Sequence, residues 1–288
     1  MSTATDSSEP VFRAIAVVGV GLIGGSIAAA VKQRGIAGRV VGIGRNAERL
    51  EAARQFGLLD EYETTSDAAA ESDLLVVCTP VDRIVHDALA IAAALRPGSL
   101  ITDAGSVKAG ICGALSQSEL PDGVTFIGSH PLAGSERAGW EHADPDLFEG
   151  RVCVVTPQMD SPPADCARLE AFWRHLGMQV VRMTPEDHDR ALALTSHLPH
   201  VAAAALASLL TGDLRHLAAT GFRDTTRIAG GDPKLWSAIF LNNAEPLTAD
   251  IDQLISRLSE LRSAIEENDE GRLQDLLEQG RIQRAALD

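Results

Sequence analysis

Short apolar runs alternate with helix-like segments through the first part of this chain. The runs are rich in Val, Ile and Leu, as in strands that are buried on both faces. The predicted strands are Ala14–Val20, Arg39–Gly44, Leu74–Thr79, Leu100–Asp103, Val124–Ile127, Arg151–Thr156 and Gln179–Met183. The predicted helices between the earlier strands are Leu22–Arg34, Asn46–Phe56 and Asp82–Leu95. This alternation implies parallel βαβ units and therefore predicts a doubly wound α/β sheet.

The pattern changes at Pro185, after which strand-like runs stop and helical patterns continue to the end. Ala191–Leu210 is rich in Ala and Leu, and Ala249–Glu267 repeats apolar residues near helical spacing. Helical faces this apolar pack either on the first domain or on another copy of the chain. The most apolar stretch, Leu198–Leu210, is expected to be too short to cross a bilayer.

These patterns predict three parts of the chain. Residues 1–11 form a polar, disordered tail without the features of a signal peptide, residues 12–184 form the α/β domain, and residues 185–288 form an all-α domain.

The first predicted strand ends in the pattern G-x-G-x-x-G, and a predicted helix follows at once. Gly19 permits a tight turn, Gly21 lets the backbone approach a pyrophosphate, and Gly24 lets helix and strand pack closely. The free N–H groups at the helix start then face the phosphates. An ordinary glycine-rich turn is the alternative, but the context favours a Rossmann-type dinucleotide site that includes Leu22 and Ile23.

Ligands of doubly wound sheets bind beyond the carboxyl ends of the strands. Thr79, Pro80 and Asp103 stand at such ends and are expected beside the cofactor. Sites that prefer NAD usually carry an acid at the end of the second strand. Here Gly44 occupies that place and Arg45 follows, so NAD or NADP can bind and we expect a preference for NADP.

Composition narrows the class of partner. The chain has 288 residues and a formal net charge of −15, which disfavours non-specific binding to nucleic acid or to anionic membranes. The four cysteines form no C-x-x-C pair, so buried free thiols in a reducing, cytoplasmic compartment are expected and no metal site is predicted.

Two clusters in the α/β part carry candidate chemistry. Ser106 follows a predicted strand, where it either caps the next helix or points its hydroxyl at a substrate. His130 follows another predicted strand directly and is fixed by Pro131. Oxidation of an alcohol needs a base that takes the hydroxyl proton as hydride leaves, and His130 is a candidate for that base.

Two more clusters lie in the helical part. His197 and His200 share one helix face, but no third metal ligand is obvious nearby. Asp224 and Arg227 are three residues apart, so they form either a weak surface pair or a fork for a substrate carboxylate that Asp224 orients.

Taken together and in order, these motifs resemble the prephenate/arogenate dehydrogenase family. The motifs are Gly19–Ser26, Asp103–Lys108, Ser129–Glu136, His197–His200 and Phe222–Ala229. The resemblance implies a Rossmann domain followed by a helical dimerisation domain like that of 6-phosphogluconate dehydrogenase. It also implies a cytoplasmic homodimer that oxidatively decarboxylates prephenate to 4-hydroxyphenylpyruvate, or arogenate to tyrosine, in tyrosine biosynthesis.

The same resemblance assigns roles by position. It implies that His130 is the catalytic base and that Ser106 orients both this histidine and the substrate hydroxyl. It also implies a substrate pocket with Arg227 as a carboxylate clamp. The other implied pocket residues are His200, His197, Glu136, Ser135, Asp224 and Trp236.

Several alternatives stay open at this point. Many family members carry Asp where Gly44 stands, which leaves the choice of cofactor open, and the choice between prephenate and arogenate is also open. A β-hydroxyacid dehydrogenase would need a lysine in the helical domain, where Lys234 is the only one, and a non-catalytic dinucleotide sensor would need only the glycines. We expect neither a preceding chorismate mutase segment nor a following amino-acid-sensing domain.

Overall fold

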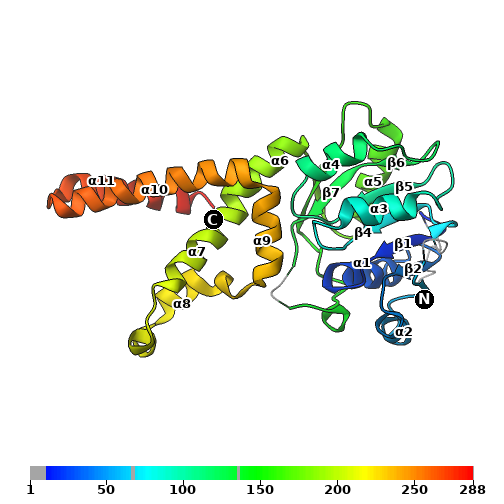
Figure 1. Cartoon of the computed structure of the whole chain (residues 1–288), viewed down its shortest axis with the longest axis horizontal. Coiled ribbons are helices and arrows are strands. Elements are labelled where there is room, and N and C mark those ends of the chain that lie inside the picture. The colour runs from blue at the N-terminus through cyan, green and yellow to red at the C-terminus, as the bar shows by residue number, and fades with distance from the viewer. Residues whose placement is uncertain (1–10, 66–68, 135–136, 288) are drawn as a thin grey trace, which may run out of the picture.

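The computed structural model describes residues 11–65, 69–134 and 137–287. They form an elongated molecule with an α/β region at one end and a helical region at the other (Figure 1). The helical region begins with α6 (Pro185–Leu192), which the Thr184 side chain caps by accepting a hydrogen bond from the Asp187 N–H. Nearly all of the predicted tail lies outside the described residues.

Six parallel strands form the main sheet, in the order β3-β2-β1-β4-β5-β6. Their bounds are β1 (Ile15–Val18), β2 (Val40–Ile43), β3 (Glu61–Glu63), β4 (Leu74–Val77), β5 (Leu100–Asp103) and β6 (Thr125–Phe126). The strand order reverses between β1 and β4, and this switch point is where such sheets bind their ligands. The sequence pattern missed β3, a polar edge strand.

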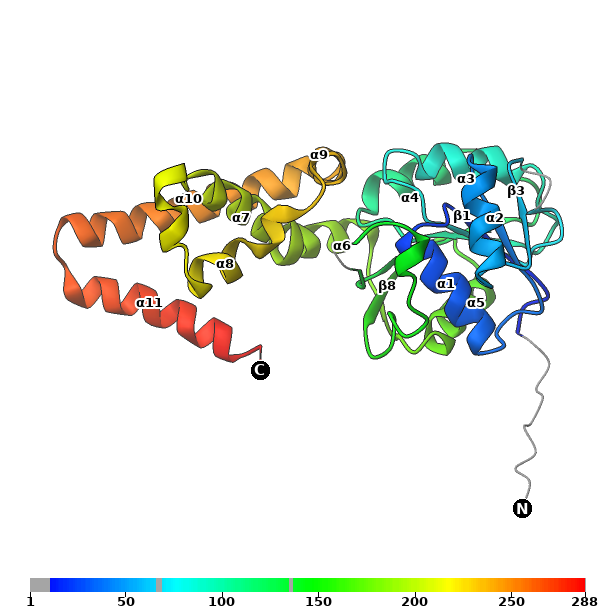
Figure 2. The same ribbon diagram turned by 90° about the horizontal axis from the view of Figure 1, so that it is seen from below.

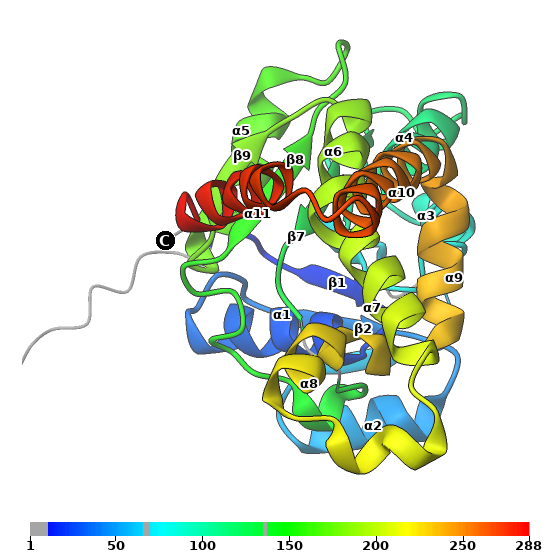
Figure 3. The same cartoon turned by 90° about the vertical axis from the view of Figure 1, so that its left-hand side faces the viewer.

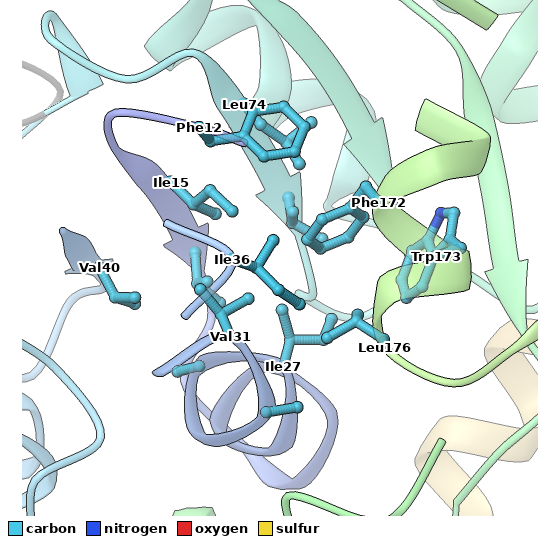
Figure 4. Close-up of a cluster of buried hydrophobic side chains, with 14 of the residues drawn as sticks. Phe12, Ile15, Ile27, Val31, Ile36, Val40, Leu74, Phe172, Trp173 and Leu176 are labelled. Atoms are coloured by element: carbon cyan, nitrogen blue, oxygen red, sulfur yellow. The ribbon is translucent and has the colours of Figure 1, made fainter. Parts of the chain in front are cut away.

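Helices cover both faces of this sheet, which confirms the predicted α/β fold. Their bounds are α1 (Leu22–Gln33), α2 (Ala47–Gln55), α3 (Ile84–Ala92), α4 (Ala109–Ser116) and α5 (Pro163–His175). On one face, Ile15 of β1 lies in a core with Ile27 of α1 and Phe172 of α5 (Figure 4). On the other face, Ile84 of α3 and Ile111 of α4 belong to a second core.

A second sheet contains β7 (Gly128–Pro131), β8 (Val152–Thr156) and β9 (Gln179–Arg182). The expectation that every strand joins one parallel sheet is wrong here, because β7 pairs antiparallel with β8. A parallel return needs a long crossover, usually a helix. Among the described residues between β7 and β8, the one regular element is a short 3-10 turn, η2 (Trp140–His142), whereas α5 connects β8 to its parallel partner β9.

The rest of the described chain is helical. Its elements after α6 are the π-helical turn η3 (Ala193–His197), α7 (Leu198–Ser208), the 3-10 turn η4 (Gly212–Leu217), α8 (Thr220–Thr226), the 3-10 turn η5 (Arg227–Gly230), α9 (Pro233–Asn242), α10 (Ala244–Glu266) and α11 (Glu270–Ala285). Helices α10 and α11 form a hairpin that extends away from the α/β region (Figures 1 and 2). Viewed from that end, α7 and α9 lie in front of the main sheet (Figure 3).

Helices α6 and α7 are one continuous run, interrupted only by the π-helical turn. Pro199 at the start of α7 has no N–H to donate to the carbonyl four residues earlier, so the run loses one ordinary α-helical bond there. The turn accommodates this loss and ends at His197. The helical run starts at Pro185, six residues before the predicted helix start at Ala191, so it includes His188 and Asp189.

The same run bears on the membrane question. Pro185–Ser208 is long and apolar enough, by length and composition alone, to cross a membrane, and 22% of its most apolar window is buried. The expectation that the apolar stretch is too short for this is therefore wrong, because the helix extends beyond Leu198 toward the N-terminus. Buried polar side chains, His188, Asp189 and His197, nevertheless interrupt the apolar character of the run.

Candidate active site

The turn between β1 and α1 is crowded at two glycines and open at the third. Gly19 has a φ of +85°, and a Cβ atom there would lie 3.0 Å from the Cys78 backbone. A Cβ at Gly24 would lie 2.3 Å from the Gly19 carbonyl oxygen. Apart from Gly21 and its two chain neighbours, no described atom lies within 4 Å of the position that a Cβ at Gly21 would take. The turn thus leaves room for a phosphate at Gly21, where the helix begins.

The other predicted cofactor residues surround this turn. Leu22 and Ile23 in the first turn of α1 are half-buried, and so is Thr79, while Pro80 is exposed. Thr79 and Pro80 follow β4, which is the neighbour of β1 at the switch point. The geometry of the turn and the chemistry of its free N–H groups therefore fit a dinucleotide.

Beyond β2, Gly44 is half-buried and Arg45 is exposed. A Cβ atom at Gly44 would lie 3.7 Å from the nearest Leu50 side-chain carbon, which is an ordinary contact. The backbone therefore tolerates a side chain at this position, and packing does not require glycine there.

Asp103 has contacts that differ from those expected. Its carboxylate is fully buried, forms an ion pair with the fully buried Lys108, and accepts a hydrogen bond from Gly105 N at 2.9 Å. Ser129 N of β7 also donates to it, at 3.2 Å. The carboxylate thus ties the loop after β5 to the second sheet. Its contact with a cofactor stays a prediction that these internal bonds do not support.

Ser106 is half-buried in this loop and does not cap the following helix, so the capping alternative is wrong. Helix α4 starts later, at Ala109, and its cap comes from the helical region. The Asp189 carboxylate of α6 accepts hydrogen bonds from Lys108 N at 2.7 Å and from Ala109 N at 2.8 Å.

His130 lies within β7, opposite Val154, rather than after a strand as expected. The predicted strand Val124–Ile127 corresponds to β6, and the sequence pattern missed β7, which begins one residue later, at Gly128. Burial lowers the pKa of the His130 imidazole well below its usual range, and electrostatic interactions with neighbouring side chains, among them the buried Lys108, lower it further. The ring is therefore neutral at physiological pH, which a general base requires.

A chain of hydrogen bonds leads from His130 into the helical region. His130 Nδ1 lies 2.8 Å from His188 Nε2, and His188 Nδ1 lies 2.7 Å from Asp189 Oδ1. Both α6 residues are buried. Sequence reasoning missed them because the predicted helix began at Ala191. The signal was Thr184-Pro185, a typical cap and first helical residue, which predicts a helix that already includes His188.

His197 is buried and is connected through Asn243 to Asp189. Asn243 Nδ2 donates one hydrogen bond to the Asp189 carbonyl, at 2.8 Å, and lies 2.9 Å from His197 Nδ1. Since an amide nitrogen only donates, His197 Nδ1 accepts and its Nε2 carries the hydrogen. Burial lowers the pKa of His197 to about 4, and its Nε2 has no partner among the described residues.

The third group gathers on α7, η5 and α9. The His200 ring stacks on Trp236, with centroids 3.4 Å apart and planes 24° apart. Burial lowers the pKa of His200, and the positive charge of Arg227 adds to this effect. Arg227 is exposed, and no ion pair between it and Asp224 is found in the described part of the chain. The predicted surface pair is therefore not formed.

The structure thus brings His130, His197, His200, Trp236 and Arg227 into one region where the two parts of the chain meet. The predicted site residues Ser135 and Glu136 lie outside the described residues.

Comparisons with known proteins agree with this arrangement. Residues 27–182 match the family model described as "Prephenate dehydrogenase, nucleotide-binding domain", and residues 184–279 match "Prephenate dehydrogenase, dimerization domain". The cyclohexadienyl dehydrogenase of Zymomonas mobilis is 35% identical over 96% of this chain and 97% of its own length.

Two solved structures are similar throughout. Prephenate dehydrogenase from Aquifex aeolicus, in complex with hydroxyphenyl propionate and NAD+, is 31% identical, has a TM-score of 0.89, and is matched over 96% of this chain and 98% of its own. Arogenate dehydrogenase from Synechocystis is 32% identical, with a TM-score of 0.82 over 96% of this chain and all of its own. The chain therefore belongs to the prephenate dehydrogenase family, whose members are NAD(P)-dependent oxidoreductases.

Proposed function

We propose that this chain oxidatively decarboxylates prephenate to 4-hydroxyphenylpyruvate in tyrosine biosynthesis. The observation that carries the proposal is His130, a buried imidazole that contacts His188 and lies near His197. His197 in turn adjoins Trp236, on which His200 stacks, and Arg227 lies near His200. Similar proteins are named for prephenate, for arogenate and for cyclohexadienyl substrates. Arogenate, which would give tyrosine, is therefore the second candidate substrate.

The reaction needs one base and correct positioning. A bound NAD(P)+ supplies the acceptor for the hydride that leaves ring C4. His130 takes the proton of the C4 hydroxyl, so that C4 becomes a ketone. The bond from C1 to the ring carboxylate then breaks, CO2 leaves, and the electron pair enters the ring, which becomes aromatic after one proton is taken up at the oxygen. Aromatisation drives this step, and no strong acid is required.

The remaining site residues bind and orient the substrate. Arg227 offers a planar fork that suits a carboxylate, and the stacked His200 and Trp236 form an adjoining wall. The buried His197 Nε2–H lacks a protein partner in the described residues, so a substrate oxygen there would satisfy an otherwise costly donor. Ser106, Ser135, Glu136 and Asp224 complete the proposed pocket.

For the cofactor, we propose a preference for NADP. Gly44 carries no acid that would repel a 2′-phosphate, and Arg45 beside it is exposed and available to contact one. Gly19, Gly21 and Gly24, with Leu22 and Ile23, would hold the pyrophosphate, and Thr79 and Pro80 would flank it.

We further propose a cytoplasmic homodimer without nucleic-acid, membrane or metal partners. Large apolar side chains are exposed along the hairpin of α10 and α11, where Ile255 is 56% and Ile265 64% exposed. Such a surface is expected to be covered by a second copy. The same cover would account for the exposed parts of the apolar run Pro185–Ser208, whose buried histidines face the active site.

The proposal is tested by supplying purified protein with prephenate or arogenate, each with NAD+ or NADP+. The absorbance of the reduced nicotinamide gives kcat/KM for the four combinations. We expect the highest value for prephenate with NADP+, with one 4-hydroxyphenylpyruvate formed per reduced cofactor. Exclusive turnover of arogenate would assign the second substrate instead, and no turnover of either would refute the proposed reaction.

Substitution of the base should affect the chemical step. His130→Ala is expected to lower kcat about 10²- to 10⁴-fold with little change in KM, since proton removal belongs to the transition state. His175→Ala, an exposed histidine on α5, serves as the control. Because burial lowers the pKa of His130, the base form persists as pH falls, and the acidic limb of wild-type kcat should lie below pH 6.5. Full activity of His130→Ala would remove it from the mechanism.

Arg227→Ala should act mainly on substrate binding. Loss of the clamp is expected to raise KM by an amount that corresponds to roughly 2–5 kcal/mol, with a smaller effect on kcat. Arg215→Ala, another exposed arginine of the helical region, should leave KM unchanged. If both variants have the KM of the wild type, Arg227 is a surface residue without a role in binding.

The cofactor preference is tested at Gly44. Gly44→Asp should lower kcat/KM for NADP+ relative to NAD+ by about tenfold or more, because the carboxylate repels the 2′-phosphate and accepts from a ribose hydroxyl. Gly44→Asn has nearly the same shape without the charge, and should shift the ratio much less. A wild-type enzyme that already prefers NAD+ would contradict the proposed preference.

A further inference from the structure

Asp189, His188 and His130 are joined by two hydrogen bonds, and Asp189 determines which nitrogen donates in each of them. We infer that Asp189 and His188 are positioning residues that hold His130 in the tautomer whose Nε2 is free to take a proton. This inference rests on the proposed role of His130 as the base. Neither α6 residue was among the predicted site residues, and each reaches the site only through another residue.

The series of hydrogen bonds starts at the Asp189 carboxylate, which acts as an acceptor. Asp189 is buried, and its two oxygens accept hydrogen bonds from Lys108 N and Ala109 N at the start of α4. Each of the two carboxylate oxygens is therefore already engaged as an acceptor. The other charged side chain close to this helix start, Lys108, is already paired with Asp103. The atom that faces His188 is Oδ1, which already accepts from Lys108 N and offers His188 a further lone pair.

His188 must therefore donate from Nδ1, which lies 2.7 Å from Asp189 Oδ1. In the neutral imidazole this places the lone pair on Nε2, the atom that faces His130. His188 Nε2 lies 2.8 Å from His130 Nδ1, so one of these two nitrogens must carry the hydrogen. The direction set at Asp189 assigns it to His130 Nδ1, and a neutral His130 then keeps its lone pair on Nε2.

The opposite direction would disable the base. If His188 donated to His130, the hydrogen of a neutral His130 would sit on Nε2, where it would block proton transfer from the substrate. In the assigned direction, His130 becomes an imidazolium when it takes the proton, and its Nδ1–H continues to donate toward Asp189 through His188. The negative charge of Asp189 then stabilises the positive charge that forms on His130, as the acid does in a hydrolase triad.

The tautomer can be observed directly. Protein labelled with nitrogen-15 at histidine gives imidazole shifts by NMR, and the His130 signals are assigned by their loss in His130→Ala. We expect a protonated Nδ1 and an unprotonated Nε2 in wild-type protein at pH 7. Protonated Nε2 at His130 would overturn the inference. This readout needs no turnover, so it separates failure of the inference from failure of the proposed reaction.

A matched pair of variants tests the functional consequence. In His188→Gln, Asp189 attracts the amide N–H and leaves the amide oxygen facing His130 Nδ1, so an acceptor remains. His188→Met has a similar length but accepts only weakly. We expect kcat of His188→Met to be at least about tenfold below that of His188→Gln at equal KM, with His130 changing tautomer only in the Met variant.

Equal kcat values and an unchanged His130 tautomer in both variants would show that His188 only fills space. The melting temperature and the affinity for the cofactor are measured for both proteins, since a merely structural role would lower these together with kcat.

Discussion

The site depends on one carboxylate that joins the two parts of the chain. Asp189 belongs to the first helix of the helical region, yet its side chain caps a helix of the α/β region. Its backbone carbonyl accepts from Asn243, which reaches it from the start of α10. A buried charge is costly unless fully paired, so these bonds restrict how the two regions can sit against each other. The position of His130 relative to Arg227 follows from that restriction.

A second buried ion pair fixes the position of β7, the strand that carries His130. Asp103 and Lys108 are both fully buried, and between them they bind the loop after β5 to the backbone of β7. This fixes the strand that carries His130 relative to the switch point where the dinucleotide turn lies. His197 Nε2 is one of five buried side-chain atoms without a hydrogen-bond partner in the described part of the chain, and it lies close to Trp236 in the substrate region. A substrate oxygen bound beside this donor would accept its hydrogen bond and so remove the cost of leaving it unpaired.

Much of this arrangement could be predicted from local patterns. The strand, glycine turn and helix at residues 14–34 have a period and a turn chemistry that specify the nucleotide-binding unit. The positions of β7 and of His188 could not be predicted in this way. The first depends on the antiparallel pairing of β7 with β8, and the second on the contact of His188 with His130, which lies 58 residues earlier in the chain. Nothing in the local sequence distinguishes Asp189 from a surface acid, because its role follows from its contact with the start of α4.

With His130 as the base, the hydroxyl proton and the C4 hydride of the substrate leave beside this residue, in a pocket completed by the helical region. A crystal structure of the protein with NAD(P)+ and 4-hydroxyphenylpyruvate shows whether the ring binds there. We expect the phenol oxygen within about 2.6–3.2 Å of His130 Nε2 and the side-chain carboxylate against Arg227. A ring bound elsewhere, or a His130 that contacts the product through no ring nitrogen, would exclude His130 as the base.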